Sequence, residues 1–332
     1  MLPWIRYSYA ARQEHELDRI SALVSLLAAL ALISCGSNST KQDPTDKLLE
    51  ESFKGKWGYI DRDGNMVIEP QFKNAGEFSE GLARIQIERK HGYIDKSGKM
   101  AIEPQYDFAD DFSEGLAPVE VASKWGYIDK TGKMVIKPKF EQAKKFSDGL
   151  ANVEIGGKWG YIDKNGDLVI KPQYDVIGEF SEGLARVVID GKCAYIDKMN
   201  IIVIKPRFHH AWPFSEGLAA VEVDQEWGYI DKSGQFIIKP QFVAADQFSE
   251  GVACVLVRSL LGVRWGYVDR RGNMVLEPQF RWAATFSEGL AVVKIGDKYG
   301  FMNRSGDAVI KPQYAEAGQF SEGLARVGLD RK

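Results

Sequence analysis

One string of residues recurs eight times along this chain, and this internal period constrains the fold more than any other feature. Its clearest copy runs from Lys158 to Leu184 and reads KWGYIDKNGDLVIKPQYDVIGEFSEGL. Successive copies lie 34 residues apart, except for a step of 38 residues between Trp227 and Trp265. The tryptophan position is held in turn by Trp57, His91, Trp125, Trp159, Cys193, Trp227, Trp265 and Tyr299. Such a chain must fold as a repeat architecture in which each copy packs on its neighbours.

Paired helices, a common structure at this period, are excluded by the composition of the repeat. Each copy contains a proline, and glycines recur at the turns, so no long helix can form. The remaining residues are mainly β-branched and aromatic, which favours strands. We therefore predict an all-β protein. The prolines are Pro70, Pro104, Pro138, Pro172, Pro206, Pro240, Pro278 and Pro312.

The pattern within one copy predicts three strands. Residues 150–155 (LANVEI) alternate between apolar and polar side chains, as a half-buried strand does. A second strand is predicted over 159–163. The third runs over 167–170 and is expected to end at Pro172, because proline cannot donate to a β-ladder. Residues 173–183 are predicted to form a longer connection.

Two tight turns are predicted between these strands. Gly156 and Gly157 occupy the first, and Gly166 supplies the positive φ that the second needs. Asn200 replaces this glycine in the fifth copy, and asparagine tolerates that conformation well. The aspartate before the second turn resembles the start of a calcium loop, but position twelve of that loop is Tyr174 rather than glutamate. A hairpin turn is the better interpretation.

The repeated residues resemble the bacterial WG-repeat family, which is named for its Trp-Gly pair. That pair stands here as Trp57-Gly58, Trp125-Gly126, Trp159-Gly160, Trp227-Gly228 and Trp265-Gly266. The likeness covers about residues 53–329, and three copies depart from the signature, with His91-Gly92, Cys193-Ala194 and Tyr299-Gly300. The resemblance implies a tandem β-rich array with an interaction or surface role. It transfers no catalytic residue and names no ligand.

Eight repeats of three strands could form a closed, propeller-like ring or an open superhelical array. The chain enters the array at a second strand, with Trp57, and leaves it on a first strand, over residues 324–329. The last strand could therefore pair with the first hairpin and remove both exposed sheet edges. We expect the ring, although propeller blades usually have four strands.

The first 52 residues do not belong to the array. Residues 1–34 are predicted to be a lipoprotein signal peptide, because the apolar run over 20–32 has the length of a signal-peptide core and ends in Leu32-Ile33-Ser34-Cys35. Cys35 is the predicted lipidation site, residues 35–52 a flexible tether, and 53–332 the β domain. A plain signal peptide with an unmodified cysteine is the alternative. The expected location is the cell envelope, at the outer membrane or periplasmic face.

The net charge limits the classes of possible binding partner, and the cysteine content limits the possible disulfides. The formal net charge is −3, and no basic excess indicates nucleic acid. The interspersed charges are interpreted as solvated faces. Cys193 and Cys254 lie too far apart in the array for a disulfide and are expected to be separate buried thiols. His91 is expected to be a packed ring.

No enzyme is predicted. Catalysis needs unlike groups that converge in one pocket, whereas the aspartates and glutamates here recur in nearly every copy. The sequence has no phosphate loop, zinc-protease motif or nucleophile elbow. No cofactor and no metal are expected. Residues His209 and His210 form a weak metal pair, because adjacent histidines rarely chelate one ion.

The informative positions are those that break the repeat. The five variable residues after Pro-x-Phe/Tyr are mostly small or charged, but they bring His209, His210 and Trp212 into the fifth copy, and Arg281 and Trp282 into the seventh. A four-residue insertion between them lies within 257–264 and carries Arg258 and Arg264. Such residues on loops are typical of binding surfaces. Drift in tolerant loops is the alternative explanation.

These observations favour a lipid-anchored extracytoplasmic interaction module for a protein, peptide or glycan partner, with the membrane reached through the N-terminal lipid. A structural envelope component without a dedicated ligand is the alternative, and a hydrolase is disfavoured. The recurring tryptophans, Trp57, Trp125, Trp159, Trp227 and Trp265, are interpreted as structural.

Overall fold

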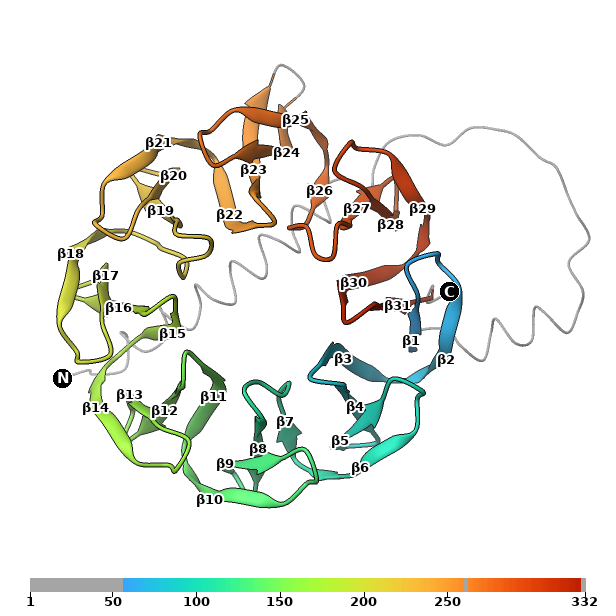
Figure 1. The fold of residues 1–332 in the computed structure, drawn as a ribbon, viewed down its shortest axis with the longest axis vertical. Helices are drawn as coiled ribbons and strands as arrows, with labels where there is room; N and C mark the ends of the chain where they lie inside the picture. Colours follow the sequence, from blue (N-terminus) through green and yellow to red (C-terminus); the bar gives the residue numbers. More distant parts are fainter. Residues whose placement is uncertain (1–55, 260–261, 330–332) are drawn as a thin grey trace, which may run out of the picture. The chain divides into compact units, whose positions relative to one another are not determined.

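Each copy of the repeat contributes one antiparallel sheet, and eight sheets surround a central opening as the blades of a β-propeller in the computed structural model (Figure 1). The structure describes residues 56–259 and 262–329. The predicted signal peptide, Cys35 and the tether lie outside the described residues. No helix in the described part of the chain could cross a membrane.

Seven blades follow one another along the chain, each running from an innermost to an outermost strand. Blade 1 contains β3 (Asn74–Ser79), β4 (Leu82–Ile87), β5 (Lys90–Asp95) and β6 (Met100–Tyr106). Blade 2 contains β7 (Phe108–Ala109), β8 (Leu116–Val121), β9 (Lys124–Asp129) and β10 (Met134–Phe140). Blade 3 contains β11 (Gln142–Ser147), β12 (Leu150–Ile155), β13 (Lys158–Ile162) and β14 (Leu168–Tyr174).

Blade 4 contains β15 (Ile177–Ser181), β16 (Leu184–Ile189), β17 (Lys192–Ile196) and β18 (Ile202–Phe208). Blade 5 contains β19 (Ala219–Val223), β20 (Glu226–Ile230) and β21 (Phe236–Phe242). Blade 6 contains β22 (Ala244–Ser249), β23 (Val252–Ser259), β24 (Gly262–Asp269) and β25 (Met274–Phe280). Blade 7 contains β26 (Trp282–Ala283), β27 (Ala291–Ile295), β28 (Lys298–Met302) and β29 (Ala308–Tyr314).

Blade 8 closes the ring with strands from both ends of the array. Its order is β30 (Glu316–Ser321), β31 (Leu324–Gly328), β1 (Trp57–Ile60) and β2 (Met66–Phe72). The register pairs Trp57 with Gly328 and Ile60 with Ala325. The expected pairing of the last strand with the first hairpin is confirmed, and it removes the two sheet edges that an open array would expose.

The prediction of three strands per repeat was wrong. A fourth strand lies inside the predicted connection over 173–183, where β15 forms the channel edge of blade 4. The pairing of such innermost strands is irregular, with a register shift such as that between Ile177 and Phe180, so their sequence shows no clean alternation. In blade 5 the innermost segment is reduced to two isolated bridges, Ala211 with Val221 and Ser215 with Leu218.

The expected end of the third strand at proline was also wrong. Strand β14 continues through Pro172 to Tyr174. Its register jumps between the pairs Tyr161–Ile170 and Trp159–Tyr174, so the proline occupies an irregularity on an outermost strand, where no ladder bond is lost. This strand passes so close to β13 that a Cβ on Gly160 would lie 2.5 Å from the Ile170 carbonyl oxygen. That approach explains the glycine of the Trp-Gly pair.

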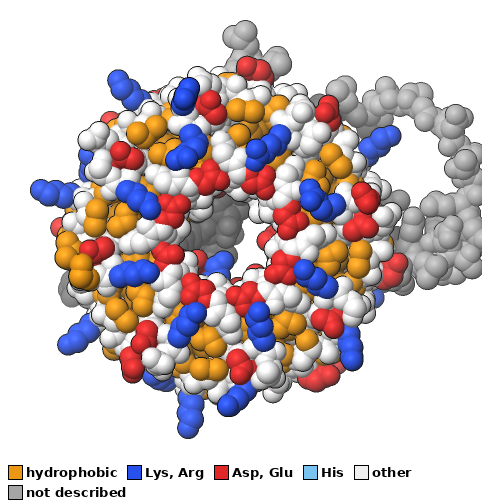
Figure 2. All heavy atoms as spheres, viewed as in Figure 1, with side chains coloured by type: hydrophobic (Ala, Val, Ile, Leu, Met, Phe, Trp, Pro, Cys, Tyr) orange, Lys and Arg blue, Asp and Glu red, His pale blue; other side chains and the backbone are white. Residues whose placement is uncertain are grey.

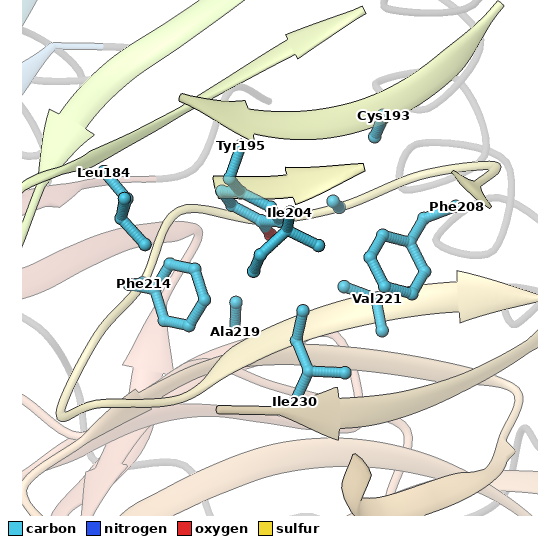
Figure 3. Packing of buried hydrophobic residues seen from close by; sticks show 10 residues of the cluster. Leu184, Cys193, Tyr195, Ile204, Phe208, Phe214, Ala219, Val221 and Ile230 are labelled. Atoms are coloured by element: carbon cyan, nitrogen blue, oxygen red, sulfur yellow. The ribbon is translucent and has the colours of Figure 1, made fainter. Parts of the chain in front are cut away.

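Both faces of β12 are buried over residues 150–153, unlike the half-buried strand predicted over 150–155. Asn152, expected on a solvent face, is only 4% exposed. The hydrophobic core consists of one cluster for each pair of neighbouring blades. Figure 3 shows the cluster between blades 4 and 5, where Tyr195 packs near Phe214, with ring centroids 4.9 Å apart. The hydroxyl of Tyr195 also donates to the Trp212 carbonyl oxygen at 2.6 Å.

The turns agree with the sequence predictions. Gly166 has φ of 84° and Asn200 has φ of 64°. The Asp163 carboxylate accepts bonds from the backbone N–H groups of Asn165 and Asp167, at 2.9 and 3.0 Å, as expected for a hairpin turn. These bonds lower the pKa of Asp163.

Candidate functional site

The ring has two unlike faces. We call the first the turn face, which carries the Phe-Ser-Glu-Gly turns between innermost and second strands and the Asp-containing turns between third and outermost strands. We call the second the variable face, which carries the hairpins between second and third strands and the connections between blades. Contacts between neighbouring elements define each face.

The turn face is held by contacts that repeat around the whole ring. Ser147 donates its hydroxyl to the Phe180 carbonyl oxygen of the next blade at 2.6 Å, and equivalent bonds occur at all eight junctions. The bond from Ser321 to Phe78 spans the closing junction. We call this closed set of bonds the serine belt.

A second set of repeated contacts uses the acidic residue of the same turn. Glu114 has φ of 54°, and its carboxylate accepts the Gly149 N–H of the next blade at 3.0 Å. Lys164 pairs with Glu114 at 3.1 Å. Figure 2 shows the corresponding pattern, an inner circle of acidic side chains with basic side chains outside it. The interpretation of these charges as merely solvated was wrong, because they join blades.

The variable face gathers the residues that break the repeat. Its hairpins and connections touch each other, as the Glu141 carboxylate shows by accepting the Gly156 and Gly157 N–H groups at 3.2 and 3.0 Å. The inserted hairpin between β23 and β24 therefore lies on the same face as the connections that carry His209 and Arg281. The insertion thus lies on the variable face, and three consecutive blades, 5 to 7, contribute to the group.

Blade 5 supplies the densest part of this group. The Nδ1 atom of His210 lies 2.8 Å from Oε2 of Glu222, and the His210 ring stacks on Trp227 with centroids 6.5 Å apart. His209 is exposed, and its backbone N–H donates to the Glu222 carbonyl oxygen. Trp212 is 42% exposed although its indole N–H donates to the Ala245 carbonyl oxygen of blade 6 at 3.1 Å.

Blade 6 adds basic side chains beside this group. Arg258 pairs with Glu226 of blade 5 at 3.2 Å, with 66% of the arginine side chain exposed. Arg264 donates to the Val263 carbonyl oxygen, a bond within its own hairpin. Trp212 and Arg258 thus each bond across the junction of blades 5 and 6, while the contacts of His210 lie within blade 5, at Glu222 and Trp227.

Blade 7 places its two residues differently. Arg281 is exposed, whereas Trp282 is half-buried and packs edge-on against Tyr299 of the same blade at 5.5 Å. Trp282 also joins the cluster between blades 7 and 8. Its ring therefore supports the blade as well as lining the variable face.

The signature position lies near the variable face but is less buried than expected for a main packing element. Trp159 is half-buried, while Tyr161, two residues later, is fully buried. The largest fully buried side chains are tyrosines and phenylalanines. Trp57 is covered by the Arg326 guanidinium at 4.9 Å from its ring centroid.

The remaining predicted residues of interest are packed as expected. His91 is 3% exposed, stacks on Phe108 at 5.5 Å, and its pKa is lowered by burial. Cys193 and Cys254 are buried free thiols in blades 4 and 6, and burial raises the pKa of both. Among the described residues there is no group of three or more His, Cys, Asp or Glu residues that could hold a metal ion.

Sequence reasoning missed a polar pocket in the channel wall. It has a volume of about 160 Å³ and is lined by Glu77, Phe78, Ser79, Asp111, Phe112, Ser113, Lys145 and Ser321. Burial raises the pKa of Asp111, whose Oδ1 lies 3.8 Å from the Arg84 Nε atom. The signal was the fifth variable residue of each connection, which is charged in the first four copies. Ligand pockets usually measure about 300–1,000 Å³, so this one fits a single side chain at most.

Comparisons with known proteins agree with the fold. The family model described as "WG containing repeat" matches residues 57–90, 92–125, 125–159, 159–193, 194–227, 227–260, 265–299 and 299–332. A search of curated proteins finds no match. A crystal structure of "the eukaryotic initiation factor" is 10% identical, with a TM-score of 0.52 over 80% of this chain and 87% of that chain.

Two other solved structures are more distant in shape. PorZ of Porphyromonas gingivalis, described as a bacterial surface component of the type-IX secretion system, is 10% identical with a TM-score of 0.41, over 76% of this chain and 41% of that chain. Kluyveromyces lactis Hsv2p is 9% identical with a TM-score of 0.46, over 68% of this chain and 90% of that chain. At such identities a likeness concerns the fold alone.

Proposed function

Because the chain belongs to the WG containing repeat family and folds as an eight-bladed propeller, we propose that it is an interaction module without catalytic activity. It binds a protein, peptide or glycan through the variable face of blades 5 to 7. A lipid on Cys35 holds the ring at the cell envelope, on the outer membrane or its periplasmic side.

The observation that carries this proposal is the clustering of the repeat-breaking residues. The histidine, tryptophan and arginine departures lie in the connections and hairpins of blades 5 to 7, whereas the apolar departure at Met199 and Ile201 lies in a turn of blade 4. Trp212 and Arg258 each bond across the junction of blades 5 and 6, and His210 stacks on Trp227, the residue next to the Glu226 that Arg258 contacts. Exposed aromatic and arginine side chains are the types that most often dominate binding energy at interfaces.

Substitution of the predicted lipidation site tests the proposed location of the module. In cells that express the full chain, Cys35→Ser should move the protein from the membrane fraction to the soluble extracytoplasmic fraction, because a single lipidated cysteine would be its attachment. Labelled palmitate should enter the wild type and not the variant. If the variant stays in the membrane fraction and the wild type incorporates no labelled palmitate, the anchor is contradicted.

The interaction is tested by retention of envelope proteins on the immobilised full chain. A specific partner should bind saturably to the wild type, and Trp212→Ala and Arg258→Ala should each weaken it by about 1–2 kcal/mol or more. Val309→Thr is the matched control, since Val309 is 47% exposed on an outermost strand. Binding that is equal in all four proteins would contradict the site, and the lack of any saturable partner would favour the structural role.

A further inference from the structure

One turn departs from the other seven in chemistry as well as in sequence. Between third and outermost strands every other copy has polar residues around its glycine, as in Lys232-Ser233-Gly234-Gln235. Blade 4 has Met199-Asn200-Ile201 instead, followed by Ile202 and Val203 at the start of β18. Met199 is 76% exposed and Ile201 is 55% exposed. We call Met199, Ile201, Ile202 and Val203 the outer patch.

Neighbouring blades extend this apolar surface along the outer wall. The exposed apolar residues there are Leu168 and Val169 in blade 3 and Phe236 and Ile237 in blade 5. Figure 2 shows hydrophobic side chains gathered on the outer wall where Figure 1 places β18. Single exposed apolar residues are ordinary, but a contiguous group of this kind marks a contact surface.

The charges around the outer patch indicate what it contacts. The residue before the repeat proline is an exposed lysine in four successive blades, 2 to 5, and again in blade 7: Lys137, Lys171, Lys205, Lys239 and Lys311. The same position is Glu69 in blade 8, Glu103 in blade 1 and Glu277 in blade 6. The apolar surface therefore lies within the basic part of the outer wall.

We propose that the outer patch inserts into the headgroup region of an anionic lipid bilayer. Apolar side chains flanked by lysines are the combination that binds such an interface. Met199 and Ile201 lie at the turn-face end of the outermost strand β18, at the rim of the ring, which suits a broad surface rather than a groove. A symmetric dimer through this patch would place lysines opposite lysines, whereas anionic lipids complement them.

This contact goes beyond the interaction module and does not depend on a lipid at Cys35. It would stand the ring on edge, with blade 4 towards the bilayer and the variable face perpendicular to it. The hairpins of blades 5 to 7 would then remain open to a partner in the surrounding solution.

Hydrogen exchange on the full chain tests the contact locally, with vesicles of phosphatidylglycerol and phosphatidylcholine as the probe. Residues 197–203 should gain protection with anionic vesicles, less at high salt, and the matched turn over 231–235 should not. The double variant Met199→Ser/Ile201→Gln, which copies the residues of blade 5, should need at least tenfold more lipid for half-protection. Val67→Thr/Val309→Thr, at 46% and 47% exposed valines of other blades, should match the wild type.

Other outcomes would overturn the proposal. If vesicles bind the chain while residues 197–203 stay unprotected, another segment makes the contact. Equal lipid requirements for the wild type and the Met199→Ser/Ile201→Gln variant would have the same meaning. Protection of 197–203 that rises with protein concentration and without lipid would assign the patch to a second copy of this chain.

Discussion

The two faces of the ring are built from the same eight repeats, yet, apart from the turn at Met199 and Ile201, sequence variation falls on them in opposite ways. On the turn face Ser147 and its seven equivalents all bond to the next blade, and even the acidic substitution Asp148 keeps the bond to the following glycine. On the variable face the equivalent connections hold histidine, tryptophan, arginine or small residues. The difference teaches that repetition here marks the contacts between blades, while departures from it mark the places free to acquire a function.

Removal of residues 324–332 should have the largest effect. It deletes β31, which lies between β30 and β1, but keeps Ser321 and Glu322, which join the serine belt and its acidic counterpart to blade 1. We expect the whole ring to lose hydrogen-exchange protection, including residues 57–68, because strand pairing rather than the turn face closes it. A chain that ends at Leu329 is the control. Retained protection over 57–68 would mean that the turn face alone suffices.

Aromatic truncation in blade 3 should separate the core from the variable face. Tyr161→Ala removes a fully buried ring and should cost about 3–5 kcal/mol of unfolding free energy. Trp159→Ala, at a half-buried ring, should cost clearly less. Chemical denaturation of both variants measures this order. A reversed order would show that the signature tryptophan is the main packing element after all.

A break in the serine belt should have a smaller effect that is confined to the turn face. Ser147→Ala leaves the part-buried Phe180 carbonyl oxygen without its hydroxyl donor and should cost about 1 kcal/mol. Thermal melting measures the loss. The retention of partners on the variable face should be unchanged, and a weaker retention would show that the two faces are coupled.

The smallest expected effect concerns pH. Burial raises the pKa of Asp246 on the channel wall, so its contribution favours the folded state at low pH and is lost as pH rises through the raised value. Asp246→Asn should therefore raise the melting temperature at pH 7 but not below pH 4, near the ordinary pKa of aspartate. An asparagine oxygen can still accept the Gln247 N–H, which Asp246 accepts at 2.8 Å. Equal shifts at both pH values would contradict this cause.

The turn aspartates should behave in the opposite way. Hydrogen bonds from Asn65 lower the pKa of Asp61, so its contribution is present at neutral pH and is lost as pH falls through the lowered value. Melting curves of the wild type between pH 7 and 3 should therefore show a loss of stability at the acid end despite the gain at Asp246.

Much of the fold followed from the sequence because the period, the turn residues and the phase of the two ends are local signals. The identities of Gly166 and Asn200 predicted positive φ angles at these positions. The array begins with a second strand and ends with a first strand, and this offset predicted the closing blade. The innermost strands were missed because their irregular pairing hides the alternation on which strand prediction relies. Asn152 was misplaced for a different reason: alternation implies a solvent face only when one side of a sheet is open.

The candidate site was predictable in composition but not in position. His210 and Arg258 stand out as departures from the repeat, whereas their meeting at one edge depends on how blades 5 and 6 adjoin. The pairing of Ser147 with Phe180 was likewise hidden, although the separation of 33 residues in six of the eight such bonds was present in the sequence. The ring geometry is needed to show that residues at this separation belong to neighbouring blades rather than to distant ones.

The closing blade also sets an order of events during synthesis. Strand β1 emerges first and must wait for β31, which emerges last, while the blades between them can already assemble. Until then β1 and β2 present a free edge that other chains could pair with. A chain that stops early, at any blade, keeps that edge permanently. Incomplete products of this repeat array should therefore aggregate or be degraded rather than persist as smaller rings.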